Sequence, residues 1–204
     1  MSLSSLEALY IKLENIDPEQ RENIAQIQYE LHRINNGLVQ LLSLYKMETR
    51  LFSLQADQYN IYDFLDELII NNTPLNSQQN FSIELACDDD LEWFFDRDLI
   101  STIINSTINN SIRYARSKII LSARIKNNYL EITIEDDGKG FPEKMCNHPK
   151  TLETAINMKS GSTGLGLYFA EKIASIHHNG EKRGTTFIDN QSSLGGGRFI
   201  LTLP

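Results

Sequence analysis

The first fifty residues place apolar side chains at alternating steps of three and four positions, which is the spacing of helices that pack along one seam. Asp17 and Pro18 interrupt this pattern with a capping residue followed by a proline suited to the first turn of a helix. We therefore predict a helical hairpin with arms over residues 3–15 and 19–49. The longer arm would leave much of its seam uncovered, so we expect a second copy in a four-helix dimer, a first helix that begins upstream of Met1, or both.

Beyond residue 50 the apolar residues form shorter segments, some with helical spacing and others with the two-residue repeat of a strand. It predicts helices over residues 62–72, 96–114 and 167–177, and strands over residues 81–85, 118–124, 129–135, 185–189 and 198–203. The expected inner face of the middle helix consists of Leu99, Ile103, Ile104, Thr107, Ile108 and Ser111. Strands that follow one another with helices segregated between them favour an α+β fold, a two-layer α/β sandwich with helices over one face of a mixed sheet. The expected domains are residues 1–50 and 51–204.

Composition and charge narrow the possible partners. The 204 residues are 41% hydrophobic and 23% charged, which is typical of a globular protein, and the formal net charge is −8. Such a surface repels nucleic acid and anionic lipid, so we expect neither as a partner. Two cysteines, Cys87 and Cys146, are too few for a disulfide framework, and no apolar run is long enough to span a bilayer. We expect a cytoplasmic chain without a membrane segment of its own, either a separate protein or the cytoplasmic part of a longer membrane-bound one.

The first segment with candidate chemistry closes the helix expected over residues 96–114. Asn110 lies there, followed by Arg113 and Tyr114. A carboxamide oxygen is a suitable ligand for Mg²⁺, which prefers oxygen ligands and commonly binds protein oxygens, water and substrate phosphates together. The alternative is a solvated helix end with no ligand.

The second segment follows the strand expected over residues 129–135 and contains Asp136, Gly138 and Gly140. A carboxylate at a strand end can accept a hydrogen bond from an exocyclic amine such as that of adenine, and glycines let a flat ligand approach the backbone. The alternative is a hairpin turn, because Asp-Gly is a common turn dipeptide.

The third segment, residues 160–167, combines glycines and hydroxyl residues before a helix. Its free backbone N–H groups would form an anion site at the positive end of the helix dipole, although no Walker lysine follows. The alternative is a flexible linker.

In this order the three segments resemble the N, G1 and G2 boxes of the ATP-binding domain of sensor histidine kinases, which share a superfamily with DNA gyrase, the ninety-kilodalton heat-shock chaperone and MutL. The resemblance covers about residues 50–204 and implies the α/β sandwich of that family, with ATP and Mg²⁺ as cofactors. It implies that Asn110 coordinates Mg²⁺ and that Asp136 binds the adenine amine. The other implied ATP contacts are Arg113, Tyr114, Gly138, Gly140, Ser162, Thr163, Gly164, Leu165 and Gly166. Residues 143–160 would form a lid.

Two features depart from the family pattern. Ser106 stands four residues before Asn110, where many family members have Asn, Asp or Glu, so a second metal contact or a hydrolytic base is in doubt. The expected lid also lacks a phenylalanine-rich box.

The hairpin resembles the dimerisation and phosphoacceptor region of the same kinases, which implies a homodimer and a response regulator receiver domain as partners. Its first arm contains no histidine, so the phosphoacceptor is either His32 on the second arm or a residue upstream of Ser4. We expect His148 and His178 to be surface residues. The implied function is ATP-dependent phosphorylation of a histidine that supplies a response regulator. The alternatives are a non-catalytic phosphotransfer or docking module, and a serine kinase or ATPase of the same superfamily.

Overall fold

The computed structural model describes residues 18–48, 53–72, 81–147 and 165–204. The chain divides into two compact units, Met1–Glu48 and Thr49–Pro204, which we consider separately. In the first unit, helix α2 (Pro18–Glu48) confirms the long helix expected over residues 19–49, and Pro18 occupies its first position. The predicted short arm over residues 3–15 lies outside the described residues. The roles and limits predicted for domains 1–50 and 51–204 stay predictions.

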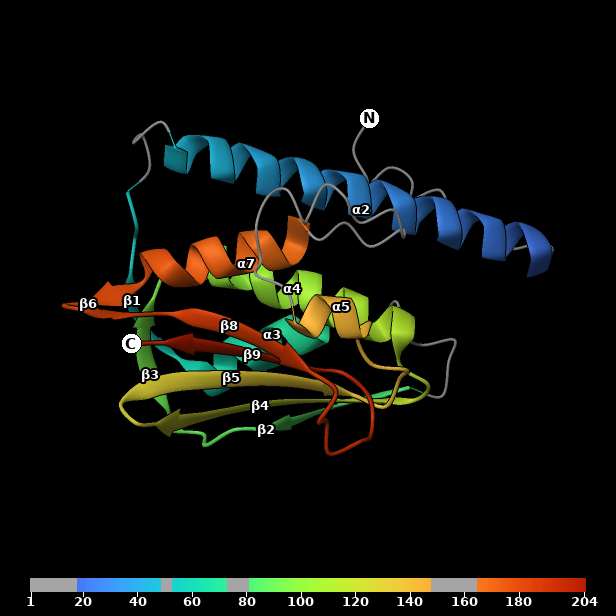
Figure 1. The fold of residues 1–204 in the computed structure, drawn as a ribbon. Coiled ribbons are helices and arrows are strands. Elements are labelled where there is room, and N and C mark those ends of the chain that lie inside the picture. Colours follow the sequence, from blue (N-terminus) through green and yellow to red (C-terminus); the bar gives the residue numbers. More distant parts are fainter. Residues whose placement is uncertain (1–17, 49–52, 73–80, 148–164) are drawn as a thin grey trace. The chain divides into compact units, whose positions relative to one another are not determined.

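The second unit is built on a five-stranded sheet with the order β2-β4-β5-β9-β8. Strand β2 (Ser82–Ala86) runs parallel to β4 (Lys118–Lys126), whereas β5 (Tyr129–Asp136), β9 (Arg198–Leu203) and β8 (Thr185–Asp189) join by antiparallel pairing. Helices α3 (Ile61–Asn72), α4 (Arg97–Tyr114) and α7 (Leu165–Ile176) lie over one face of this sheet (Figure 1). The expected two-layer sandwich with a mixed sheet is confirmed.

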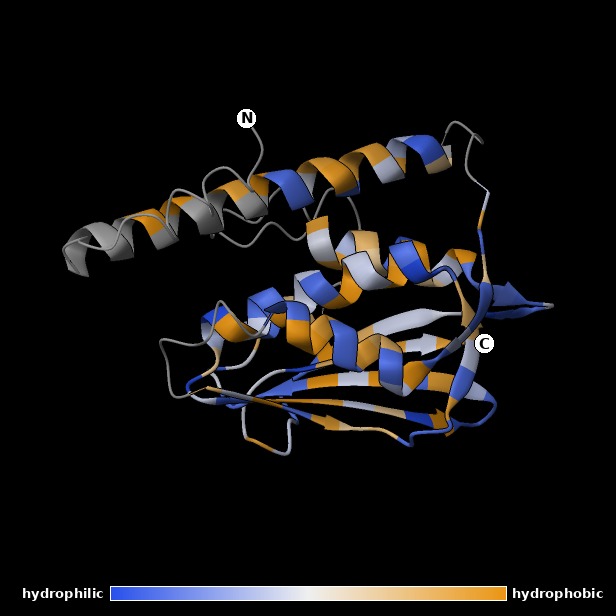
Figure 2. Ribbon diagram, turned by 180° about the vertical axis from the view of Figure 1, so that it is seen from behind, coloured by the Kyte–Doolittle hydropathy of each residue, from blue (hydrophilic) through white to orange (hydrophobic). Residues whose placement is uncertain are grey.

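The core lies between these helices and the sheet, because alternate strand residues point toward the helices. In β5 the inward positions are Leu130, Ile132, Ile134 and Asp136, and all four are buried. Helix α4 buries Leu99, Ile100, Ile103, Ile104, Ile108 and Ser111. Ile100 was not expected there, and Thr107 is only half-buried, with its hydroxyl donating to the Ile103 carbonyl at 2.9 Å. The hydropathy colouring in Figure 2 shows apolar and polar stretches alternating around the helices and along the strands.

Several short elements were missing from the sequence prediction. Strands β1 (Asp57–Asn60) and β3 (Glu92–Phe95) form a separate antiparallel pair, as do β6 (His178–Asn179) and β7 (Lys182–Arg183), and α5 (Glu143–Asn147) is a single turn and a half. The hairpin between β4 and β5 turns at Asn127 and Asn128 alone, both with positive φ. Lys126 pairs with Tyr129, so β4 extends two residues beyond the expected strand end at residue 124.

A buried histidine fastens α7 to the start of α4. Asp96 caps α4, because its side chain accepts from the Leu99 N–H at 3.2 Å, and its own backbone N–H donates to Nε2 of His177 at 3.1 Å. Nδ1 of His177 donates to the Ile173 carbonyl at 2.8 Å, which fixes the neutral tautomer. Burial lowers the pKa of His177 below its usual range, despite the opposing effects of the Ile173 carbonyl and the Asp96 carboxylate.

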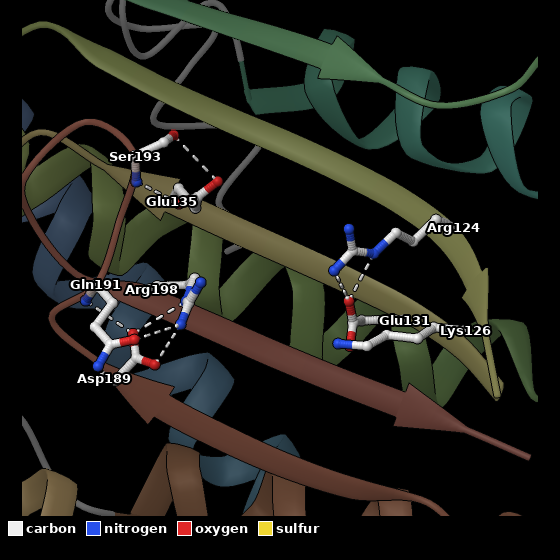
Figure 3. Close-up of polar contacts among 8 residues, drawn as sticks. All are labelled: Arg124, Lys126, Glu131, Glu135, Asp189, Gln191, Ser193 and Arg198. Atoms are coloured by element: carbon white, nitrogen blue, oxygen red, sulfur yellow. Dashed lines mark hydrogen bonds and ion pairs between the residues drawn. The ribbon is translucent and has the colours of Figure 1, made fainter.

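The sheet face that points away from the helices carries paired charges (Figure 3). Arg124 of β4 binds Glu131 of β5 through two guanidinium nitrogens, and Arg198 of β9 binds both oxygens of Asp189 on β8. These cross-strand pairs satisfy the side chains on a face that none of the described helices covers. Within the described residues, no helix has the length and apolar character needed to span a bilayer.

Candidate functional site

Asp136 is the buried acid of the candidate site. The two-residue repeat that points Ile132 and Ile134 toward the helices also points Asp136 that way, at the last position of β5 and beneath the end of α4. The residue is only 6% exposed. Its Oδ1 accepts from the backbone N–H groups of Gly138, at 2.9 Å, and Gly197, at 3.1 Å. These two donors satisfy one carboxylate oxygen and hold the side chain in a fixed orientation.

The second carboxylate oxygen of Asp136 has spare hydrogen-bonding capacity. Among the described residues, Oδ2 receives only a long contact, 3.5 Å, from the Ser111 hydroxyl. A Cβ atom at Gly197 would lie 3.1 Å from Oδ2, so any larger residue there would press on this oxygen. The arrangement leaves an oriented acceptor next to backbone without side chains, which fits a flat ligand that carries an amine.

The G1 loop, defined here as residues 136–142, leaves β5 without forming a hairpin. The hairpin alternative for Asp136-Asp137-Gly138 is wrong, since β5 pairs with β4 and β9 rather than with the next segment. Gly138 crosses directly over the end of α4, where a Cβ atom would lie 2.3 Å from the Tyr114 carbonyl oxygen. Only glycine permits this close approach.

Asp137 attaches the same loop to the segment that follows α4. Its carboxylate accepts from the Arg116 N–H at 2.7 Å and from both the backbone N–H and the hydroxyl of Ser117, the latter at 2.8 Å. Burial by itself would raise the pKa of Asp137, but these hydrogen bonds have the larger combined effect and lower the pKa to about 2. The end of α4 and the G1 loop are therefore fixed to each other.

The exposed side of the α4 end carries the three residues predicted there. Asn110 is exposed, and within the part of the chain that the structure describes its carboxamide has no hydrogen-bond partner. The Arg113 guanidinium lies 5.4 Å from the centre of the Tyr114 ring, which is 48% exposed. The described residues contain no group of three or more His, Cys, Asp or Glu side chains that could hold a metal ion. A metal at Asn110 would thus take most of its other ligands from water or from a bound phosphate.

The start of α7 lies beside the middle of α4. A Cβ atom at Gly166 would be 3.6 Å from the Ser106 hydroxyl. Because Asn110 lies one helical turn after Ser106 on α4, Leu165 and Gly166 lie in the same region as Asn110. Ser162, Thr163 and Gly164 lie outside the described residues, as does the part of the predicted lid beyond Asn147.

The structure adds residues between β8 and β9 to which the sequence analysis gave no role in the site. The Ser192 hydroxyl donates to the Asp136 carbonyl at 2.8 Å, and Gly196 and Gly197 lie against Asp136 and the G1 loop. Asn190 contacts the G1 loop directly. The run of glycines at residues 195–197 was the available signal, because consecutive glycines often mark close backbone approach.

The comparisons with known proteins agree with this fold. Residues 95–204 match the family described as histidine kinase-, DNA gyrase B- and HSP90-like ATPase. This match covers the G1 loop, the end of α4, α7 and the closing strands. The chain belongs to this family, and it carries an ATP-binding catalytic domain of the sensor histidine kinase type.

Two curated relatives are sensor proteins. The chain is 24% identical to the alginate biosynthesis sensor protein KinB of Pseudomonas aeruginosa, over 89% of this chain and 30% of KinB. It is 26% identical to the sensor histidine kinase WalK of Bacillus subtilis, over 74% of this chain and 26% of WalK. The chain therefore spans less than a third of the length of either relative.

Solved structures of the histidine kinase ThkA have the same fold. The ThkA catalytic domain matches with a TM-score of 0.63 at 20% identity, over 74% of this chain and 97% of that domain. ThkA in complex with the response regulator protein TrrA matches with a TM-score of 0.65 at 15% identity, over 99% of this chain and 56% of that one.

Proposed function

We propose that this chain is the ATP-binding catalytic region of a two-component sensor histidine kinase, which transfers the γ-phosphoryl group of ATP to a histidine and from there to a response regulator. The observation that carries the proposal is the buried Asp136 carboxylate, with Oδ1 held by two backbone N–H groups and Oδ2 directed at a glycine-lined backbone. Family membership supports the same assignment.

The adenine end of ATP would be bound at Asp136. The exocyclic amine would donate to Oδ2, and the ring would lie against the G1-loop backbone at Gly138 and Gly140. Because Oδ1 is already satisfied by Gly138 and Gly197, the carboxylate would not have to rotate when the nucleotide binds. This fixed orientation reduces the entropic cost of binding.

The phosphate end would lie between α4 and the start of α7. Asn110 would offer its carboxamide oxygen to Mg²⁺, and Arg113 and Tyr114 would contact phosphate and nucleoside. The segment Ser162, Thr163, Gly164, Leu165 and Gly166 would surround the phosphates with backbone N–H groups at a helix N-terminus. Bound Mg²⁺ would neutralise phosphate charge, so the protein's part is to position and to stabilise charge.

Helix α2 supports the proposed homodimer. Its seam positions Ile27, Leu31, Ile34, Leu38, Leu41 and Tyr45 are between 38% and 66% exposed in the single chain. An apolar row of this length at heptad spacing is typical of a helix that packs in a bundle, and a second copy of the chain would cover it. We expect light scattering to give the mass of a dimer; the mass of a strict monomer would contradict the proposal.

The phosphoacceptor would be His32 on α2 or a histidine outside this chain. The position of His32 in α2 follows from the helix bounds. The receiver of the phosphoryl group would be a response regulator, which is the kind of partner named in the ThkA complex.

Titration calorimetry of ATP with and without Mg²⁺ tests the nucleotide site. We expect Asp136→Asn to weaken ATP binding at least tenfold, because a carboxamide with its N–H₂ group toward the adenine amine would lose the acceptor. Asp89→Asn, a change at an exposed acid in the same unit, is the matched control. Unchanged affinity in Asp136→Asn would place the adenine site elsewhere.

The same titration tests the metal. Asn110→Ala should remove the gain in ATP affinity that Mg²⁺ gives to the unaltered chain, and it should leave metal-free binding intact. Equal Mg²⁺ dependence in both proteins would contradict the role of Asn110.

Incubation with labelled ATP tests phosphoryl transfer. An acid-labile, base-stable label that His32→Ala abolishes would identify His32 as the acceptor. ATP binding without any label would mean that the acceptor lies outside this chain.

A further inference from the structure

One side chain satisfies both backbone polar groups of a G1-loop residue from a distant part of the sequence. The Phe141 N–H donates to Oδ1 of Asn190 at 2.6 Å, and Nδ2 of Asn190 donates to the Phe141 carbonyl at 2.8 Å. The carboxamide thus pairs with Phe141 as a neighbouring strand would. We propose that Asn190 is a positioning residue for the G1 loop, which fixes the loop for nucleotide binding; this inference rests on the proposed function.

The loop is shaped to receive this carboxamide. Gly140 has a φ of +75°, a left-handed conformation that favours glycine, and a Cβ atom there would lie 2.5 Å from Oδ1 of Asn190. Asn190 therefore packs directly against the backbone that precedes Phe141. Both the backbone conformation and the available space at Gly140 depend on the absence of a side chain.

The base that carries Asn190 is rigid. Asn190 follows the last residue of β8, Asp189, whose carboxylate receives two hydrogen bonds from Arg198 of β9 and one from the Gln191 N–H at 2.9 Å (Figure 3). The hydrogen bonds from Arg198 lower the pKa of Asp189, which stays charged and paired at neutral pH. A side chain on this base loses little freedom when it binds the loop.

The pairing also reaches Asp136. A Cβ atom at Gly197 would lie 3.0 Å from the Phe141 ring, so the ring packs against Gly197, and the Gly197 N–H donates to Oδ1 of Asp136. Phe141 is thus held on its backbone by Asn190 and lies beside a donor to the candidate adenine-binding carboxylate. Release of Phe141 would loosen both the loop and this support.

The pairing further sets where α5 begins. Pro142 follows Phe141, and the Met145 N–H donates to the Pro142 carbonyl at 2.8 Å in the first turn of α5 (Glu143–Asn147). By holding Phe141, Asn190 therefore fixes the chain on both sides of this residue, at Gly140 before it and at the start of the predicted lid after it.

Three variants of the full chain test the proposal: Asn190→Ala, Asn190→Asp and the neighbouring control Gln191→Ala. Hydrogen exchange of the Phe141 amide, measured without nucleotide, reports the pairing itself. We expect Asn190→Ala to speed this exchange about tenfold or more, since the N–H loses its acceptor. Asn190→Asp should restore the protection, because a carboxylate still accepts from this N–H, although it cannot donate to the Phe141 carbonyl.

Calorimetric titration of Mg-ATP reports the consequence for the site. Asn190→Ala should bind about tenfold more weakly than the unaltered chain, while Gln191→Ala binds equally well and the thermal midpoints of both stay similar. Unchanged exchange in Asn190→Ala, or equal loss of affinity in Gln191→Ala, would overturn the proposal. A chain that binds no ATP in any form would refute the proposed function, while the exchange of Phe141 would still decide whether Asn190 holds the loop.

Discussion

The Asp137 carboxylate is the principal attachment of the G1 loop to the segment after α4, and we expect Asp137→Asn to weaken it. Oδ1 accepts from the Arg116 N–H, Oδ2 accepts from the Ser117 hydroxyl, and the Ser117 N–H lies 3.0 Å from Oδ2. Burial raises the pKa of this carboxyl, but the hydrogen bonds lower it more strongly, from an ordinary value of 3.8 to about 2. The substitution keeps one oxygen and removes the charge that strengthens these bonds.

The size of the effect follows from this pKa difference. At about 1.4 kcal/mol for each unit by which the pKa is lowered, the fall from 3.8 to about 2 corresponds to about 2.5 kcal/mol of stability at neutral pH. Because Asp137 is only partly buried, solvent screening reduces this to about 1–2 kcal/mol. A carboxyl whose pKa is lower in the folded state contributes stability above its unfolded pKa. The contribution is lost as the pH falls from about 4 to about 2.

Urea unfolding followed by tryptophan fluorescence measures this stability. The only tryptophan, Trp93, lies in β3 and reports the unit that contains the G1 loop. At pH 7 we expect Asp137→Asn to lose about 1–2 kcal/mol of unfolding free energy, and the difference from the unaltered chain should fall by about half near pH 3. Asp89→Asn is the matched control. Equal unfolding midpoints at pH 7, or a difference that does not shrink with acid, would refute the reasoning.

Three further predictions use the same fluorescence assay or circular dichroism. Gly138→Ala should lose at least about 2 kcal/mol of stability, because its Cβ would lie 2.3 Å from the Tyr114 carbonyl oxygen; an unchanged urea midpoint would contradict this close approach. Gly37 lies in α2 with open space where a Cβ would stand, so Gly37→Ala should stabilise the helix by about 1 kcal/mol. Circular dichroism should show this as a higher helix content. Burial lowers the pKa of His177, so stability should decrease as the pH falls below about 6.5; His177→Gln should remove this decrease and His178→Gln should not.

Sequence reasoning succeeded where a local pattern determines the structure. Helix α4 was expected over residues 96–114, and its cap at Asp96 and its end at Tyr114 both depend on neighbouring residues. Strands β8 and β9 match the expected residues 185–189 and 198–203, because alternation over five or six positions is a strong signal. The position of Asp136 at the end of a strand followed from the same alternation.

The sequence analysis did not predict the short elements, because their local residue patterns are weak. Strand β1 has only four residues, and its partner β3 begins more than thirty positions later. Four residues carry too little periodicity to separate a strand from a loop. In the folded unit α3 packs beside this pair, and Phe95 is buried against Phe64 with 4.9 Å between ring centres; these contacts involve residues distant in the sequence.

The sequence by itself determined the order of the elements, the α/β sandwich and the residues on which the proposed ATP site depends. Only the tertiary structure decided what holds those residues in place. Asn190 contacts Phe141 across 49 positions, Gly197 donates to Asp136 across 61, and His177 accepts from Asp96 across 81. Hydrogen bonds at such separations depend on how strands pair and helices pack, and no local spacing of residue types encodes them.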